Sequence, residues 1–233
     1  MENILVATDL SERSDRAMHR AFQLAEQHDA TLTVLNVVDS AFPDDLANKI
    51  KENTEERLER YCKSISRHPC TLLVRIADPA LCIHAEAEAA NADLIVLGLH
   101  RRRPVVDLFK STTLVRLVAA SRRPVLVVRD PVDHDYRRPV CGLDLSPSSA
   151  AAARMAAALC PDAPIATFHA VHVPFRSYLA PDGSAEDLRP FIDEAARRID
   201  EWLPASGLPA QCEKPEIVAE SAPLALRRTI EAT

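Results

Sequence analysis

Apolar runs and helical patterns alternate along the first 130 residues of the chain. Continuous apolar runs are typical of strands that are buried on both faces of a sheet. We expect such strands at residues 3–8, 31–38, 70–76, 93–98 and 124–128. Between them, apolar residues recur every three or four positions, which predicts helices. Regular alternation of strands and helices, with right-handed crossovers, predicts a doubly wound parallel sheet with helices on both faces.

The helix boundaries are marked by polar residues. Ser11 or Ser14 is well placed to cap the first helix, and Asp78-Pro79 begins the third, where the missing N–H of proline costs little. The second helix spans residues 44–66. We expect it to place five apolar side chains along one side: Leu46, Ile50, Leu58, Cys62 and Ile65.

The second half of the chain repeats the opening of the first. Residues 4–14 read ILVATDLSERS and residues 139–149 read PVCGLDLSPSS, which places Asp9 opposite Asp144 and Ser11 opposite Ser146 at an offset of 135. Self-similarity at so long a period predicts two whole domains rather than a solenoid. We expect domains at residues 1–130 and 139–233, joined by a linker at 131–138.

Composition narrows the class of protein. Hydrophobic residues make up 47% of the 233 residues, which is enough for buried cores. The net charge of −6 is spread evenly, with 18 basic and 21 acidic side chains in residues 1–135, so neither half is a polybasic nucleic-acid module. No apolar run approaches the roughly 18 residues of a membrane helix. The six cysteines show no Cys-x-x-Cys spacing, which favours small buried hydrophobes over disulfides or zinc ligands, and we expect a cytoplasmic protein.

Ligands of open parallel sheets bind beyond the carboxyl ends of the strands, where the strand order reverses. In this chain that rule selects Asp9, residues 37–39 and residues 98–103.

The chain resembles the universal stress protein family. The resemblance rests on ILVATDLSERSDRAM, LTVLNVVD, ADPALCIHAEAEAANADLIVLGLH and RRPVLVVRDP, which together cover nearly all of residues 1–130. In the second half, PVCGLDLSPSS, AVHVP and IVAESAPLALRRTIEA are similar to the family's opening. The resemblance implies a tandem-domain member, a strand order of 3-2-1-4-5 and a role in stress adaptation. Many members bind ATP, and others do not.

The resemblance also implies where a nucleotide would bind. Asp9 corresponds to the acidic residue near the ribose or adenine, and Val37 to the residue whose backbone contacts adenine. In ATP-binding members, Gly-x-x-Gly, nine residues and then Gly-Ser/Thr enclose the phosphates. Here Gly98 matches the first glycine, but Arg101 stands at the second. Ser111 stands at the third. The glycine cradle is therefore absent.

Other features can still attract an anion. Ser111 and Thr112 would open the last helix, where hydroxyls and free N–H groups favour anions, and His100 lies in the same loop. Arginine forks at Arg101 and Arg102 can replace backbone amides as phosphate ligands. Against the single acid Asp107, residues 101–123 hold seven basic side chains: Arg101, Arg102, Arg103, Lys110, Arg116, Arg122 and Arg123.

Three interpretations of function stay open. In the first, the chain has a degenerate site for ATP or another anionic small molecule. In the second, the chain is a dimerisation or scaffold module, the basic loop is only solvated, and Asp9 only caps the first helix. The third, an enzyme of the related ATP-using α/β class, is disfavoured because the turn after the first strand has neither a glycine-rich loop nor His-x-Gly-His. We expect no catalytic residues and no metal site. His169 and His172, three apart on a predicted strand, point to opposite faces.

The second copy stops early in this sequence. Residues 221–233 match the helix that precedes the fourth strand of the first domain, so the second sheet lacks counterparts of strands four and five. Either the chain belongs to a fuller protein of about 275–290 residues, which we favour, or a partner covers the edge at residues 140–143. We expect the second half to hold no nucleotide and the protein to form a homodimer.

Overall fold

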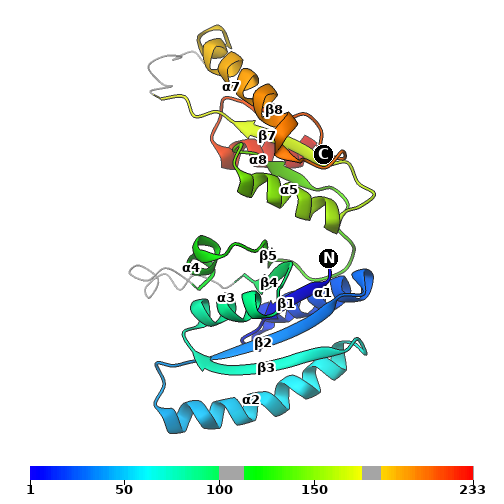
Figure 1. The fold of residues 1–233 in the computed structure, drawn as a ribbon, viewed down its shortest axis with the longest axis vertical. Coiled ribbons are helices and arrows are strands. Elements are labelled where there is room, and N and C mark those ends of the chain that lie inside the picture. The colour runs from blue at the N-terminus through cyan, green and yellow to red at the C-terminus, as the bar shows by residue number, and fades with distance from the viewer. Residues whose placement is uncertain (100–112, 175–184, 233) are drawn as a thin grey trace. The chain divides into compact units, whose positions relative to one another are not determined.

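The computed structural model describes residues 1–99, 113–174 and 185–232, which form two compact units, Met1–His134 and Asp135–Thr233 (Figure 1). Each unit contains a parallel sheet flanked by helices. The expected α/β class is confirmed.

The first unit contains five parallel strands in the order β3-β2-β1-β4-β5. This is the order implied by the family resemblance. The strands lie close to the predicted positions: β1 (Asn3–Ala7), β2 (Thr31–Asp39), β3 (Cys70–Ala77), β4 (Leu94–Gly98) and β5 (Val125–Val128).

In the described part of this unit, four helices connect the strands. They are α1 (Glu12–His28), α2 (Asp44–Ile65), α3 (Pro79–Ala89) and α4 (Thr113–Ala120). The chain runs from β1 outward to β3 and then returns past β1 to β4, and right-handed crossovers consequently place α1 and α2 on one face and α3 and α4 on the other. The strand order reverses at β1 and β4, so a ligand is expected at their carboxyl ends.

One core cluster of the first unit lies between β1, β2, β4 and the α3–α4 layer. Leu5, Leu35, Ile95 and Leu117 are fully buried there, and the side chain of Val37 packs against the same cluster. On the opposite face of the sheet, Met18 and Phe22 of α1 are also buried. The continuous apolar runs of β1 and β4 are explained by this burial, because helices cover both faces of the central strands.

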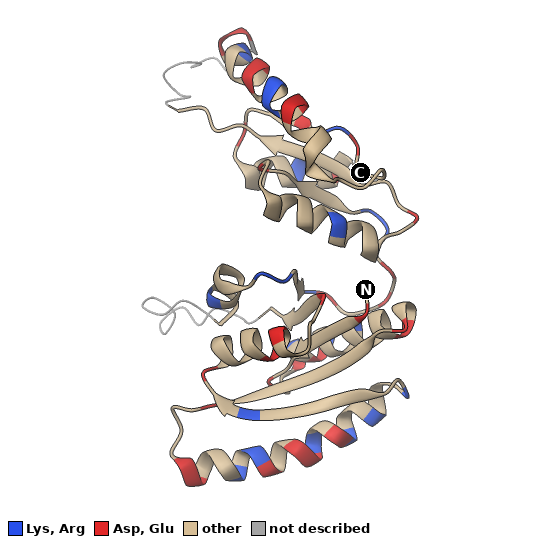
Figure 2. Ribbon diagram, in the orientation of Figure 1, with Lys and Arg blue, Asp and Glu red and all other residues tan. Residues whose placement is uncertain are grey.

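The buried side of α2 agrees with the prediction at Leu58 and Cys62 but differs from it at Leu46. Its buried residues are Ala47, Thr54, Leu58 and Cys62, whereas Leu46 is 46% exposed. At 100° per residue, Ala47 lies within about 20° of Leu58 around the helix, but Leu46 lies about 120° away. Figure 2 shows acidic and basic residues interspersed along this helix, as expected for its solvent-facing side.

The second unit has a parallel sheet in the order β6-β7-β8. Its described residues form β6 (Val140–Gly142), α5 (Pro147–Leu159), β7 (Ala166–Ala170), α7 (Ala185–Ser206), β8 (Glu216–Val218) and α8 (Ala222–Ala232). Among the described strands, β6 pairs with β7 alone.

Two features of this unit differ from the sequence expectation. Strand β7 ends at Ala170, so the placement of His172 on that strand is wrong. Helix α7 was not among the expected elements and contains Pro190 and Pro204, residues that usually break helices. On α8, Leu226 and Ile230 are largely exposed.

Candidate functional site

The parallel register brings the predicted site residues to one edge of the first sheet. Ala7 of β1 pairs with Leu35 of β2 and with the residue before Gly98 of β4. Asp9, just beyond the end of β1, and Val37, within β2, therefore each follow that row by two residues, and Gly98 of β4 follows it by one. The structure thus brings Asp9, Val37 and Gly98 together at the point where the strand order reverses.

The backbone turns sharply at Asp9. Its Oδ1 accepts a hydrogen bond from the backbone N–H of Ser11 at 3.0 Å, and Leu10 between them adopts a left-handed φ of 57°. The hydroxyl of Ser11 then accepts from the N–H of Ser14 at 3.4 Å, which confirms Ser11 as the cap of α1. Asp9 thus supports the helix start while its side chain remains exposed.

The turn keeps Asp9 ionised. Burial raises the pKa of Asp9, but hydrogen bonds from Ser11 and Ser14 outweigh burial and hold the pKa below its ordinary value. At neutral pH Asp9 is therefore a carboxylate whose position is fixed by the backbone, and it can accept hydrogen bonds from hydroxyl or amino groups of a ligand.

A buried hydrogen-bond network lies behind this turn. The hydroxyl of Thr8 donates to Ser14 Oγ at 2.9 Å and accepts from the N–H of Leu10 at 3.0 Å. Asn36 Nδ2 donates to the carbonyl oxygen of Thr8 at 2.8 Å, which ties the end of β1 to β2. These bonds use the polar groups of the buried Thr8 and restrict movement of Asp9.

The second unit contains the same turn. Asp144 Oδ1 accepts from the N–H of Ser146 at 2.9 Å, Leu145 has a φ of 65°, and the hydroxyl of Ser146 accepts from the N–H of Ser149 at 3.1 Å. The Ser146 hydrogen bonds lower the pKa of Asp144. The Asp9–Ser11 and Ser11–Ser14 hydrogen bonds and the left-handed φ of Leu10 thus have counterparts 135 residues later. The bond from the Leu10 N–H to the Thr8 hydroxyl has none, because residue 143 is leucine.

Gly98 is needed where α1 crosses β4. A Cβ atom at this position would lie 2.6 Å from the carbonyl oxygen of Arg13, far inside normal contact distance. Close packing of the first turn of α1 therefore requires a glycine here, whether or not a ligand binds. The other predicted ligand residues, His100, Arg101, Arg102, Ser111 and Thr112, lie outside the described residues.

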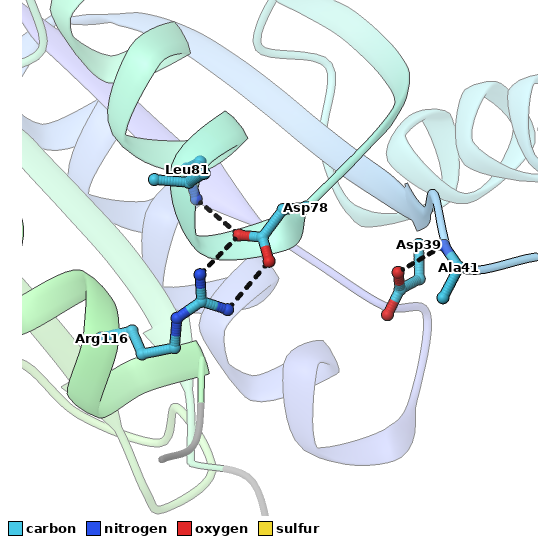
Figure 3. Close-up of polar contacts among 5 residues, drawn as sticks. All are labelled: Asp39, Ala41, Asp78, Leu81 and Arg116. Atoms are coloured by element: carbon cyan, nitrogen blue, oxygen red, sulfur yellow. Dashed lines mark hydrogen bonds and ion pairs between the residues drawn. The ribbon is translucent and has the colours of Figure 1, made fainter. Parts of the chain in front are cut away.

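Two members of the basic cluster are paired with carboxylates. Figure 3 shows Arg116 of α4 donating two hydrogen bonds to Asp78, at 2.9 and 3.1 Å, while Asp78 also accepts from the N–H of Leu81 and caps α3. The Arg116 hydrogen bonds lower the pKa of Asp78. Arg123 makes a similar fork to Glu88, at 3.0 and 3.1 Å.

The Asp78–Arg116 pair joins α3 to α4 at the carboxyl edge. Sequence reasoning identified Asp78 only as the start of a helix and Arg116 only as one of seven basic residues. The two lie 38 positions apart, and no spacing rule connects them. Asp39, at the end of β2, caps its own turn by accepting from the N–H of Ala41 at 2.9 Å (Figure 3).

A cleft of about 590 Å³ opens between the start of α1 and the second half of α2. The sequence did not indicate it, because the two walls come from separate helices. Asp9, Val37 and Gly98 do not line it. Its lining residues are Thr8, Leu10, Ser11, Glu12, Ser14, Asp15, Arg57, Arg60, Tyr61 and Ser64.

Within the described parts of the chain, no three His, Cys, Asp or Glu side chains are grouped so as to hold a metal ion. In the same residues, no helix has the length and apolar content needed to cross a bilayer.

Comparison with known proteins gives consistent matches. The sequence model of the Universal stress protein family matches residues 1–129. A putative universal stress protein of Staphylococcus haemolyticus (strain JCSC1435) is 26% identical over 148 residues, 58% of this chain and 90% of the relative. One of Staphylococcus aureus (strain USA300) is 29% identical over 140 residues, 55% of this chain and 84% of the relative.

One solved structure is similar over both units. The crystal structure of a universal stress protein from Archaeoglobus fulgidus DSM 4304 aligns with 98% of this chain and 84% of its own, with a TM-score of 0.64 and 17% identity. At that identity the likeness is one of fold.

Proposed function

Because the chain belongs to the universal stress protein family, we propose that it is a stress-response protein whose first unit binds ATP or another anionic small molecule. The binding site is the carboxyl edge of the sheet at β1, β2 and β4, and it is a degenerate form of a nucleotide site, without the glycine cradle.

The observation that carries this proposal is the ionised, fixed carboxylate of Asp9 beside Val37 at the switch point of the sheet. Asp9 would accept hydrogen bonds from ribose hydroxyls or the adenine amino group, and the backbone of Val37 would contact the base. His100, Arg101 and Arg102, with Ser111 and Thr112, would hold the phosphates. Charged side chains in place of backbone amides make the expected affinity modest and sensitive to salt.

The second candidate function is a dimerisation or scaffold module that binds no nucleotide. The hydrogen bond that Asp9 accepts from the N–H of Ser11 in the turn before α1 and the packing role of Gly98 favour this candidate, because each explains a site residue without a ligand. An enzyme is the third candidate. We propose no turnover beyond slow nucleotide hydrolysis, and metal-dependent hydrolysis on the order of 1 s⁻¹ or faster would contradict this.

We further propose that the chain is a tandem member with domains at residues 1–130 and 139–233 and a linker at 131–138. The matched turns at Asp9 and Asp144 and the parallel first three strands of each unit support this. The second domain is proposed to hold no nucleotide. We also propose that the protein is a homodimer, which size exclusion with light scattering would measure as twice the chain mass. The proposed location is cytoplasmic. The six free cysteines support that location.

Calorimetric titration with ATP tests the binding proposal. We expect saturable binding that weakens as salt rises, is lost in Asp9→Ala and weakens in Arg101→Ala. Asp9→Asn preserves the side-chain oxygen that accepts from the N–H of Ser11, and it separates loss of charge from loss of the turn. Asp144→Ala, which alters the same turn in the second unit, is the matched control and leaves binding unchanged. Absence of binding, or binding unaffected by both Asp9→Ala and Arg101→Ala, would favour the scaffold function.

A further inference from the structure

Two cysteines of the first unit are neighbours in space. Cys62 lies in the last turn of α2, and Cys70 is the first residue of β3. Helix α2 packs against β3, and the short connection between them brings the end of α2 close to the start of β3. Cys70 lies on the same face of β3 as Leu72 and Val74, which line a recess against α2, and Cys62 is on the buried side of α2. The two thiols also affect each other's pKa, and neither is in a disulfide.

The connection between α2 and β3 is held by hydrogen bonds to α1 and its end. The hydroxyl of Ser66 donates to Glu26, and His68 Nε2 donates to the carbonyl oxygen of Ala30 at 2.8 Å. The positions of Cys62 and Cys70 are therefore set by tertiary contacts rather than by a free loop. This restriction raises the effective concentration of one thiol at the other.

Their exposure differs in a way that suits two chemical roles. The side chain of Cys62 is buried, with 4% exposed, whereas Cys70 is half-buried and can be reached from solvent. A small oxidant meets Cys70 first, and Cys62 is positioned to react with the product.

We propose that Cys62 and Cys70 are a modification site that forms a reversible intrachain disulfide with hydrogen peroxide as oxidant. The Cys70 thiolate attacks a peroxide oxygen, the O–O bond breaks, and a sulfenic acid and water form. The Cys62 sulfur then attacks the Cys70 sulfur, the S–O bond breaks and a second water leaves. Two thiols lose two electrons and two protons in all, and one peroxide is reduced to two waters. A dithiol reductant reverses the reaction by thiol–disulfide exchange.

Burial makes this reaction slow at neutral pH. Burial raises the pKa of the Cys62 thiol to about 12, with Cys70 adding to the rise, and burial also raises the pKa of Cys70. The thiolate is the reacting form, and its fraction rises about tenfold per pH unit below the pKa. The pair therefore responds to lasting exposure rather than to a brief pulse, and its rate of oxidation increases about tenfold between pH 7 and 8.

Peptide mapping of the intact chain tests the proposal. Cleavage after Arg and Lys separates the two residues, since Cys62 falls in Tyr61–Lys63 and Cys70 in His68–Arg75. After peroxide treatment, blocking of free thiols and digestion, we expect these two peptides joined, with the loss of two hydrogens. Dithiothreitol should release them. The wild-type chain supplies this result, so no variant has to fold for the test to be decisive.

Variants then assign the roles. In Cys62→Ser, Cys70 should progress to sulfenic and sulfinic acid without a joined peptide. Cys82→Ser is the matched control, because Cys82 is a half-buried thiol on α3 whose ionisation is affected by Glu86 and Arg75 rather than by another cysteine. Its joined peptide should form at the wild-type rate. If Cys62 and Cys70 stay available to alkylation, oxidise separately or join to other cysteines, the proposal is wrong. The result is independent of ATP binding.

Discussion

Asn36 and His169 make the same contact in the two units. Asn36 Nδ2 donates to the carbonyl oxygen of Thr8 at 2.8 Å, and His169 Nδ1 donates to that of Leu143 at 2.6 Å. Each accepting residue immediately precedes the aspartate of its turn. Two different side chains therefore donate to equivalent carbonyl oxygens in the two units. The contact requires a hydrogen-bond donor at this position rather than one residue type.

This equivalence predicts which substitutions His169 tolerates. His169→Asn should have a free energy of unfolding within about 0.5 kcal/mol of the wild-type value, because asparagine makes this contact in the first unit. His169→Ala should lower the free energy of unfolding by about 1–2 kcal/mol, since it leaves the Leu143 carbonyl without its partner. Urea unfolding followed by the fluorescence of Trp202, the single tryptophan, reports on the second unit. An equal loss in both variants would contradict the assignment.

The two helix caps give a paired test of how the units unfold. Ser11→Ala and Ser146→Ala each remove the hydroxyl that accepts from the first turn of a helix, and each should cost about 1 kcal/mol. Trp202 lies in the second unit, so Ser146→Ala should shift the fluorescence transition, whereas Ser11→Ala should shift only the part of the circular dichroism transition that belongs to the first unit. If both variants shift fluorescence equally, the units unfold as one.

Asp144 should make the second unit sensitive to acid. Hydrogen bonds from Ser146 hold the pKa of Asp144 in the folded chain below its ordinary value. Its contribution to stability is consequently complete above the unfolded-state pKa of about 3.9 and is lost as pH falls through the lower folded pKa. Carboxyl NMR should give a higher pKa for Asp144 in Ser146→Ala than in the wild type. A pKa at or above the ordinary value in the wild type would refute the hydrogen-bonding explanation.

Leu10 should prefer residues that accept a left-handed backbone. Its φ of 57° is unfavourable for a side chain with a branched Cβ, and glycine adopts it without strain. Leu10→Val should therefore be less stable than Leu10→Gly by on the order of 1 kcal/mol or more, although valine preserves more apolar surface. Thermal unfolding of both variants measures the difference. Leu145, with a φ of 65°, should show the same order.

The sequence predicted the first unit well because its signals are local. Apolar runs mark β1 and β4, and Ser11 and Asp78 mark the helix starts that they cap. The position of Asp9 at the carboxyl edge followed from its place just after the first predicted parallel strand, whereas the strand order was implied by the family resemblance. These features depend on neighbouring residues and on the general handedness of crossovers, both of which can be inferred from one chain.

The predictions were wrong where tertiary contacts, rather than local sequence, determine which residues are buried and where elements end. The buried side of α2 depends on helical phase, so the small Ala47 and Thr54 face the core and the larger Leu46 does not. The alternating pattern of β7 continues past Ala170 to the buried Val173, so its end could not be located from the pattern. Helix α7 was not predicted, because Pro190 lies within it and proline usually breaks helices. The Asp78–Arg116 pair and the cleft between α1 and α2 are each formed by segments far apart in the sequence, and no local sequence signal predicts that these segments are in contact.

The carboxylate partners of Arg116 and Arg123 change how an approaching anion is attracted. Each fork holds an opposite charge within 3.1 Å, so beyond a Debye length of about 10 Å each pair acts as a neutral dipole. At most five of the seven basic side chains between residues 101 and 123 then contribute to the distant field. Diffusional encounter with anions will consequently be slower than the basic count suggests.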